Sequence, residues 1–504
     1  MQDPLIGYFQ SHRKLVEGDA LDLIRGSPQP LDLSRRLIEM AGADSPFVTR
    51  AMVESLLGSS TVSAPTAPSR LAATEAARPR PASATLPPPE FSVLREGFEP
   101  LAADRDPLES YGGLFAQRYA ALSRILRGRS GLPDLTSVGT LRSREGEASL
   151  IGMVREIRTT SEKHHTILTI EDESGAVEVL VPKGAPEVRE PFLPDEVVGL
   201  RLRVSRERGR IPVVTGVLRP DIPPTREQHR APYEARAVFV SDLHIGSASF
   251  MTDAWERLIE FLRGRGPGSE IVESIRHFVI AGDLVDGIGV YPNQERDLAI
   301  VDIFEQYAEL GRRLREIPDR IQVIAIPGNH DAVSPAEPQP ALPRELVALL
   351  PSSVKILSNP STFSLDGVVV TAYHGRGFDD LVPAIPGASY ARPTEIMKRM
   401  LAMRHLAPMY GGKTPLTPQS RDGLIIDPIP DIFVTGHAHT FGVDQYKGVL
   451  LLNASTWQAE TEYQRMRNIS AVPARAAIVR LTDLSLDVRD FSVGGESPAP
   501  EAAA

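Results

Sequence analysis

The stretch AVFVSDLHIGS, residues 237–247, shows the pattern that decides the fold: a short apolar run that ends in a group of polar residues. Its first five residues carry no charge and include two valines, which is typical of a buried strand. Four later stretches repeat the pattern, namely HFVIAGDLVDG (277–287), QVIAIPGNHDA (322–332), VVVTAYHGR (368–376) and DIFVTGHAHT (431–440). The sequence therefore predicts an α/β fold with five buried strands, each of which delivers polar side chains where it ends.

The polar residues after these strands form a candidate set of metal ligands. The set contains Asp242, His244, Asp283, Asn329, His330, His374, His437 and His439. Because ligands of α/β sheets gather beyond the carboxyl ends of the strands, we expect these side chains to converge on one site. A lone Asp or His after a strand usually does no more than close a turn, but five such endings in order favour a shared role.

The types of donor indicate two divalent metal ions. Carboxylate, imidazole and carboxamide groups suit manganese, iron, zinc or magnesium, and the chain has no cysteine to offer a thiolate. Two ions that share a bridging carboxylate can activate a nucleophile and hold both the attacking and the leaving oxygen of a phosphoester. Asp283 is the natural bridge.

The order of the motifs resembles that of the calcineurin-like binuclear metallophosphoesterases, whose pattern is DxH, GD, GNHD, H and GHxH. The resemblance implies a β-sandwich flanked by helices. It assigns Asp242, His244, Asp283 and His439 to one ion, and Asp283, Asn329, His374 and His437 to the other. It also implies that His330 is not a ligand but lies near the scissile phosphate, where an imidazolium could protonate the leaving alkoxide, and that Asp331 orients His330.

A narrower resemblance lies between the motifs. The segments MRHLAPMYGGKTPLT (403–417) and NASTWQAETEYQRMRNI (453–469) resemble the small subunit of the archaeal family D DNA polymerase, over residues 95–490. The chain has Ala438 where that family commonly has Val, which leaves both neighbouring ligands in place. The resemblance implies a manganese-type 3′–5′ exonuclease that proofreads DNA ends. Its implied partners are a large catalytic polymerase subunit, DNA and, through the complex, the sliding clamp.

Two other functions remain open. A double-strand-break repair nuclease would use the same metal set, but the predicted barrel ahead of the catalytic domain and the 403–417 segment speak against it. A catalytically silent scaffold subunit would keep the fold without the ligands, and the complete ligand set speaks against that.

Composition limits the partners. The net charge of −10 argues against a broad basic face that would hold nucleic acid tightly without a partner. No run reaches the roughly 18 apolar residues of a membrane span, and the start MQDPLIGYF lacks the basic and apolar regions of a signal peptide. We expect a cytoplasmic protein.

The chain divides into five predicted parts. Residues 1–58 show helical periodicity, 59–92 are a Pro- and Ala-rich disordered linker, 93–225 hold a helix and an OB-type barrel, 226–492 are the nuclease domain, and 493–504 are a disordered tail. The barrel follows from five strand-like runs within residues 149–218.

Two groups of basic residues are candidates for contact with nucleic acid. In the barrel they are Arg201, Arg203, Arg206, Arg208 and Arg210, for which a solvated strand and turn is the favoured alternative. In the insertion 376–430 they are Lys398, Arg399, Arg404, His405 and Lys413, where guidance of a single strand and docking of a partner are equally favoured.

Overall fold

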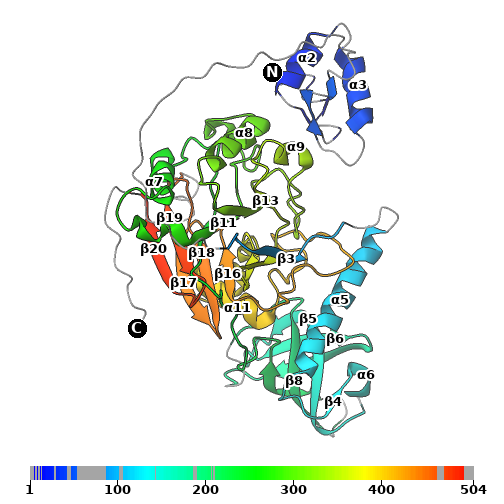
Figure 1. Ribbon diagram of the computed structural model, residues 1–504. Helices are drawn as coiled ribbons and strands as arrows, with labels where there is room; N and C mark the ends of the chain where they lie inside the picture. Colours follow the sequence, from blue (N-terminus) through cyan, green and yellow to red (C-terminus); the bar gives the residue numbers. More distant parts are fainter. Residues whose placement is uncertain are drawn as a thin grey trace.

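The computed structural model describes residues 87–100, 106–141, 143–185, 190–205, 207, 210–461 and 470–492, and parts of residues 5–53 (Figure 1). The predicted linker up to residue 86 and the predicted tail from residue 493 lie outside the described residues. Among the helices of these described parts, none is long and apolar enough to cross a membrane.

Two six-stranded sheets form the central sandwich. The first has the order β13 (Lys355–Ile356), β12 (Gln322–Ile326), β11 (Ile275–Ala281), β10 (Arg236–Val240), β19 (Arg475–Arg480) and β20 (Leu486–Asp490). The second has the order β17 (Phe441–Tyr446), β18 (Val449–Ala454), β16 (Ile432–Thr435), β15 (Val368–Ala372), β14 (Ser361–Leu365) and β3 (Phe91–Glu96). The five predicted strands are β10, β11, β12, β15 and β16, and within each sheet they run parallel to one another.

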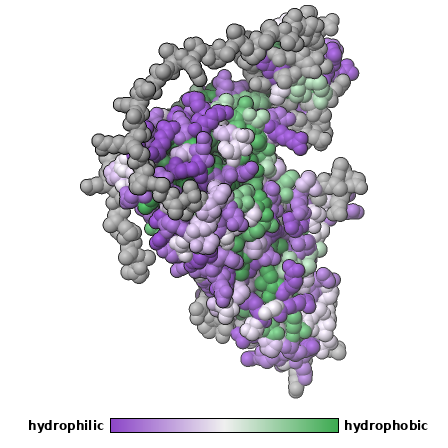
Figure 2. Space-filling model, viewed as in Figure 1, coloured by the Kyte–Doolittle hydropathy of each residue, from purple (hydrophilic) through white to green (hydrophobic). Residues whose placement is uncertain are grey.

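Alternation along the strands separates two hydrophobic layers. In β10, Ala237 and Phe239 pack between the two sheets, whereas Val238 and Val240 pack against helices on the outer face. These outer elements are α7 (Thr252–Leu262), η1 (Ser269–Ser274), α8 (Ile303–Leu314) and α9 (Arg344–Val347). Figure 2 shows hydrophilic side chains over α7 and α8, as expected for helices whose apolar sides face a sheet.

The insertion between β15 and β16 covers the other sheet. It contains α10 (Phe378–Ala384) and α11 (Pro393–Met403), and Met397 and Leu401 of α11 pack against Phe433 of β16. The helix α11 ends at Met403, because the next residue, Arg404, takes a φ of +57°. The predicted sandwich with flanking helices is confirmed.

The pairing of strand β3 corrects one predicted domain boundary. It pairs antiparallel with β14, from Glu96 opposite Ser361 to Phe91 opposite Leu365. The predicted boundary between residues 92 and 93 falls inside this strand, because a single six-residue run carries too little periodicity to reveal its partner. Residues 91–96 belong with the sandwich, and the other domain boundaries stay predictions.

The predicted OB-type barrel is present. Its strands are β4 (Leu135–Thr136), β5 (Gly146–Thr159), β6 (Thr166–Asp172), β7 (Gly175–Val181), β8 (Val197–Val204) and β9 (Val213–Leu218). The order is β4-β5-β6-β7-β9-β8, and pairing of β5 with β8 closes the sheet on itself. The short helix α6 (Val138–Leu141) packs into the barrel core, and Leu122 and Leu126 of α5 (Pro107–Arg127) pack on the outside against Ile151.

The amino-terminal module contains the predicted helices α2 (Gly18–Arg25) and α3 (Pro30–Ala41). Two segments that were predicted to be helical instead form a short parallel pair, β1 (Leu15–Val16) and β2 (Phe47–Val48). Val48 is fully buried beside Leu33 and Leu37 of α3, so tertiary packing outweighs the local helical spacing.

Candidate metal centre

The predicted ligands leave their strands within a few residues of the last paired position. Asp242 lies two residues beyond β10, Asp283 two beyond β11, His374 two beyond β15 and His437 two beyond β16. Five of the predicted ligands take the left-handed backbone conformation, which is uncommon outside glycine: Asp242 (φ +52°), His244 (+49°), Asp283 (+49°), His437 (+66°) and His439 (+54°). Such strain gathers at functional sites, where the surrounding structure enforces it.

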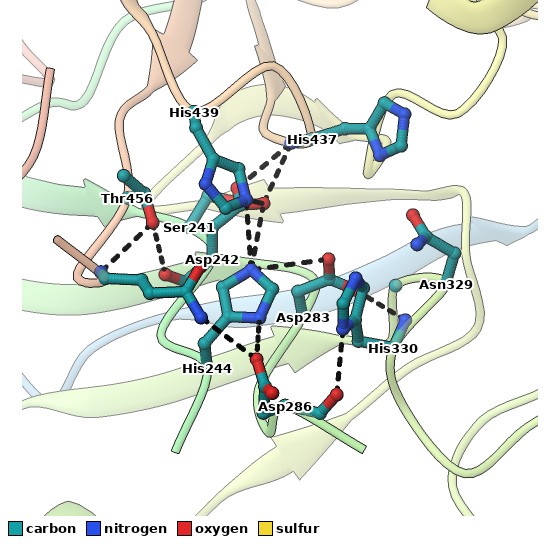
Figure 3. Close-up of polar contacts among 12 residues, drawn as sticks. Ser241, Asp242, His244, Asp283, Asp286, Asn329, His330, His437, His439 and Thr456 are labelled. Carbon is teal, nitrogen blue, oxygen red and sulfur yellow. Dashed lines mark hydrogen bonds and ion pairs between the residues drawn. The ribbon is translucent and has the colours of Figure 1, made fainter. Parts of the chain in front are cut away.

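Three side chains form the first half of the centre (Figure 3). The Nε2 atoms of His244 and His439 face each other at 3.0 Å, and the Oδ1 atom of Asp242 lies 3.2 Å from His439 Nε2. The same oxygen lies 3.8 Å from His244 Nε2. These three buried donors converge in the way that a divalent ion requires.

Asp283 connects this half to a second one. Its Oδ2 atom lies 3.7 Å from His244 Nε2 and 3.2 Å from His374 Nε2. The amide oxygen of Asn329 lies 3.0 Å from the same His374 nitrogen. Asp283 is therefore positioned between the two predicted ligand sets, as a bridging carboxylate would be.

Close packing explains two of the glycines beside the ligands. A Cβ atom at Gly328 would lie 2.3 Å from Asp283 Oδ1, and one at Gly436 would lie 2.3 Å from Asp242 Oδ2. Either side chain would push a carboxylate out of position. The backbone can approach both carboxylates because these two residues have no side chain.

His437 is the predicted ligand that the structure places differently. Its backbone N–H donates to both carboxylate oxygens of Asp242, at 3.1 and 3.0 Å, but its Nε2 atom lies 3.2 Å from Asp379 Oδ2. The ring still stands beside His374, with centroids 5.2 Å apart. His437 thus lies beside His374 in the second half of the centre, and its Nε2 atom faces Asp379, which is not one of the predicted ligands.

His330 lies next to the first half. Its ring packs edge-on against His244, with centroids 4.6 Å apart, and its backbone N–H donates to Asp283 Oδ1 at 2.8 Å. The Nδ1 atom lies 2.8 Å from the carbonyl oxygen of Asp286. A carbonyl can only accept, so Nδ1 carries a proton and Nε2 is the nitrogen left for a substrate.

The predicted role of Asp331 requires correction. Its carboxylate accepts from the backbone N–H groups of Gly328 and Leu284, at 2.8 and 3.0 Å, and from the Tyr307 hydroxyl at 2.8 Å. The Asp286 carbonyl, and not Asp331, orients the His330 ring. Adjacent side chains of an irregular loop point in different directions, so Asp331 does not face the His330 ring. Its hydrogen bonds instead anchor the loop that carries Asn329 and His330.

Electrostatics favour bound cations at this centre. Burial opposes the charge on Asp242 and Asp283, but the surrounding imidazole rings outweigh it and hold the pKa of both carboxyls well below the usual range. Burial works against a charged His374 as well, yet the charge of Asp283 raises the pKa of that ring to about 9. Burial raises the pKa of Asp331 to about 6, and the charge of Asp283 adds to the effect. Because the ionised carboxylates are stabilised by positive neighbours, divalent cations can take over that role.

The donor set fits two divalent ions. Carboxylate, imidazole and amide donors are those that manganese, zinc and iron accept. Among the described residues, two groups of predicted ligands, Asp242 with His244 and His439, and Asp242 with Asp283 and His374, each hold their ligand atoms within 4.8 Å of one another. The ring orientations agree with metal binding, because ligating histidines usually donate their second N–H to a carboxylate or carbonyl. His244 Nδ1 lies 2.9 Å from Asp286 Oδ1, and His374 Nδ1 lies 3.0 Å from the Ala281 carbonyl.

Two residues of the centre escaped prediction from the sequence. Asp286 orients His244 and is itself bonded to Gln294 and Gln458, each at 3.1 Å. It stands three residues after Asp283 in the same motif, and that proximity is the signal that could have revealed it. Asp379 had no such signal, because it lies in the insertion and meets His437 across 58 residues of chain.

Most of the basic residues of the insertion are unavailable to DNA. Arg399 is buried and pairs with Glu196 at 2.9 Å, Arg404 donates to the Ile426 carbonyl at 2.6 Å, and His405 is buried against Asp422 at 2.9 Å. Lys398 pairs with Glu395 at 2.9 Å, whereas Lys413 is exposed. Guidance of a single strand, one of the two alternatives left open by the sequence, is therefore excluded for the buried members.

For the arginines of the barrel, both alternatives stay open: contact with nucleic acid, and a solvated strand and turn. Arg203 is exposed and lies 3.1 Å from Glu147, and Arg210 is exposed and lies 2.6 Å from Glu207. Arg201 is exposed as well. Arg206 and Arg208 lie outside the described residues.

Comparison with known proteins places the chain among polymerase subunits. Residues 237–443 match the family of DNA polymerase alpha/epsilon B subunits. The DNA polymerase II small subunit of Archaeoglobus fulgidus is 40% identical over 378 residues, which cover 74% of this chain and 75% of that protein. The DNA polymerase II small subunit of Halobacterium salinarum is 34% identical over 501 residues, which cover 95% of this chain and 96% of that protein.

A solved structure of YfcE, a phosphoesterase from E. coli, is 18% identical and covers 51% of this chain and 100% of that chain. Its TM-score is 0.26, a value too low to support an argument about function.

Proposed function

The chain belongs to the family of DNA polymerase II small subunits of archaea, and from this premise we propose that it is the proofreading subunit of a heterodimeric replicative polymerase. In this proposal it pairs with a large catalytic polymerase subunit. Its activity is a metal-dependent 3′–5′ exonuclease that hydrolyses phosphodiesters at single-stranded or mispaired DNA ends.

One observation carries the proposal. Buried donors from the ends of four strands, β10, β11, β15 and β16, form two groups whose ligand atoms lie within 4.8 Å of one another, and Asn329 from the end of β12 lies 3.0 Å from His374 in the second group. Burying several carboxylates and imidazoles together costs desolvation free energy, which a bound cation can offset. A silent scaffold subunit would have no need of this arrangement, and it could replace the donors with apolar residues.

The proposed ligands divide between two ions. Asp242, His244, Asp283 and His439 would hold the first, and Asp283, Asn329, His374 and His437 would hold the second. Divalent ions at these positions would lower the pKa of the attacking water and neutralise charge on the phosphate. The donor set suits manganese, iron, zinc or magnesium, and manganese is the ion that the resemblance to the family D small subunit implies.

The protein's own residues supply the proton for the leaving group. The Nδ1–H group of His330 donates a hydrogen bond to the Asp286 carbonyl, so the Nε2 atom can donate a proton only when the ring is doubly protonated. A nearby phosphate would favour that charged form. As the bond between phosphorus and the 3′ oxygen breaks, Nε2 would donate its proton to the departing oxygen.

Hydrolysis of a 5′-labelled single-stranded oligonucleotide by the purified chain tests the proposal. We expect cleavage with added Mn²⁺ and none after chelation of divalent ions, with the same result when the large subunit is present. Cleavage that persists after chelation would contradict the metal-dependent mechanism.

A further inference from the structure

We propose that Asp379 is a positioning residue that fixes the His437 ring with its Nδ1 atom available to the second metal ion. The inference rests on the proposed function and deepens it, since it concerns one ligand of the proposed site. The observation behind it is the 3.2 Å contact between His437 Nε2 and Asp379 Oδ2.

Two of the other ligand rings show how this site fixes a histidine. His244 directs Nδ1 to the Asp286 carboxylate and Nε2 to His439 in the first half of the centre. His374 directs Nδ1 to the Ala281 carbonyl and Nε2 to Asp283. In both rings an acceptor outside the cluster holds one nitrogen, so the other nitrogen keeps its lone pair for an ion.

His437 follows the same rule with its two nitrogens exchanged. The Asp379 carboxylate can only accept, so Nε2 of His437 carries the proton and Nδ1 keeps the lone pair. Figure 3 shows the His437 ring on the side of the cluster where Asn329 lies, away from His244 and His439. The ring therefore belongs to the second ligand set and would bind through Nδ1.

The backbone cannot orient this ring without a second contact. The His437 N–H is fixed by Asp242, but two side-chain torsions separate it from the ring, and 15% of the side chain is exposed. The Asp379 contact removes that freedom. The Tyr390 hydroxyl donates to Oδ1 of Asp379 at 2.6 Å. The position of the Asp379 carboxylate is therefore fixed independently of its contact with the His437 ring.

The neighbouring Asp380 offers a matched control on the same helix. It is buried, and its two oxygens accept from the backbone N–H groups of Lys413 and Thr414, at 2.6 and 3.0 Å. Asp380 thus holds the 410–414 loop, whereas Asp379 holds the ligand ring. A substitution at Asp380 tests whether disturbing α10, without removing the contact to His437, is enough to weaken metal binding.

The experiment compares Mn²⁺ binding to the full-length wild type, Asp379→Leu, Asp379→Asn and Asp380→Asn, by calorimetry and electron paramagnetic resonance. We expect Asp379→Leu to weaken one of two ions by roughly 10- to 100-fold, the usual effect of losing an outer partner of a ligand. The spin-coupled signal of an ion pair should be replaced by that of a single ion. Asp379→Asn should recover much of the affinity, because its amide oxygen can accept the same hydrogen bond, and Asp380→Asn should bind both ions as the wild type does.

Circular dichroism of each variant separates these effects from misfolding. Wild-type affinity for both ions in Asp379→Leu would overturn the inference, as would an equal loss in Asp380→Asn or a wild type that binds only one ion. If the binding pattern is as expected but no variant, wild type included, hydrolyses DNA, the inference stands and the proposed exonuclease activity fails.

Discussion

The buried cluster of Arg118, Asp422 and His405 gives a prediction for stability as a function of pH. His405 Nε2 lies 2.9 Å from Asp422 Oδ2, and Arg118 Nε donates to the same oxygen at 2.6 Å. All three side chains are buried, and the cluster joins α5 to the loop after α11. Burial, with the charge of Arg118 added, lowers the pKa of His405 to about 4.

The size and sign of the effect follow from this pKa. An unfolded histidine begins to bind a proton near pH 6.5, whereas the folded ring remains neutral until about pH 4. Between these values the unfolded state holds more protons, so the free energy of unfolding falls as the pH falls. A difference of 6.5 against about 4 corresponds to an upper limit of about 3 kcal/mol, at about 1.4 kcal/mol per unit.

The assay compares the wild type with His405→Gln, whose amide can still donate to Asp422. Urea unfolding is followed between pH 7 and pH 4 by tryptophan fluorescence. Both tryptophans of the chain, Trp255 and Trp457, lie in the hydrophobic layer between the first sheet and its outer helices, so the signal reports unfolding of the sandwich. Because other histidines titrate in both proteins, the difference between the two curves isolates His405. We expect the wild type to lose up to about 3 kcal/mol relative to the variant on acidification. Parallel curves, or a relative gain by the wild type, would refute the argument for a neutral buried ring.

The remaining predictions concern the metal centre. Asp283→Ala should lose both ions and all hydrolysis while the barrel stays folded, and calorimetry that still counts two Mn²⁺ equivalents would exclude the bridging role. His330→Ala should keep both ions but lose roughly 100- to 10,000-fold in hydrolysis, the usual contribution of a general acid, whereas Asn329→Ala should be partly rescued by excess Mn²⁺. The His330→Ala defect should shrink on a nitrophenyl phosphodiester, whose leaving group needs no proton, and an equal defect on both substrates would assign His330 to phosphate binding. Asp286→Asn should weaken the first ion by roughly 10- to 100-fold, because an amide cannot accept from His244 and both glutamine neighbours at once; unchanged Mn²⁺ affinity would count against its role.

The sandwich could be predicted because its central strands are short apolar runs that end in polar motifs. The barrel could be predicted because five strand-like runs follow one another within residues 149–218 and are separated by turn residues. The place of β3 could not be predicted, since the strand finds its partner β14 more than 260 residues away. The pairing of Leu15–Val16 with Phe47–Val48 also depends on burial beside α3, which helical spacing does not reveal.

The candidate ligands could be predicted because each is tied to the end of a strand. Their supporting partners could not, because contacts such as Asp379 with His437 depend on how the insertion folds over the sheet. The same holds for Arg399, which looks like a free cation in the sequence but is buried against Glu196 of the barrel domain, 203 residues earlier. Residue type and spacing reveal which groups could bind an ion, and tertiary packing decides which of them point toward it.

Degradation of a 3′-mismatched primer by the reconstituted heterodimer in Mn²⁺ tests the central claim most directly. The primer carries a label at its 5′ end, and the Asp283→Ala heterodimer, with the same large subunit, serves as the control. The account predicts a ladder of products shortened one nucleotide at a time from the 3′ end, faster for the mismatched than for the paired primer, and absent with Asp283→Ala. An equal rate of shortening with Asp283→Ala, or no shortening by the wild-type heterodimer, would contradict it.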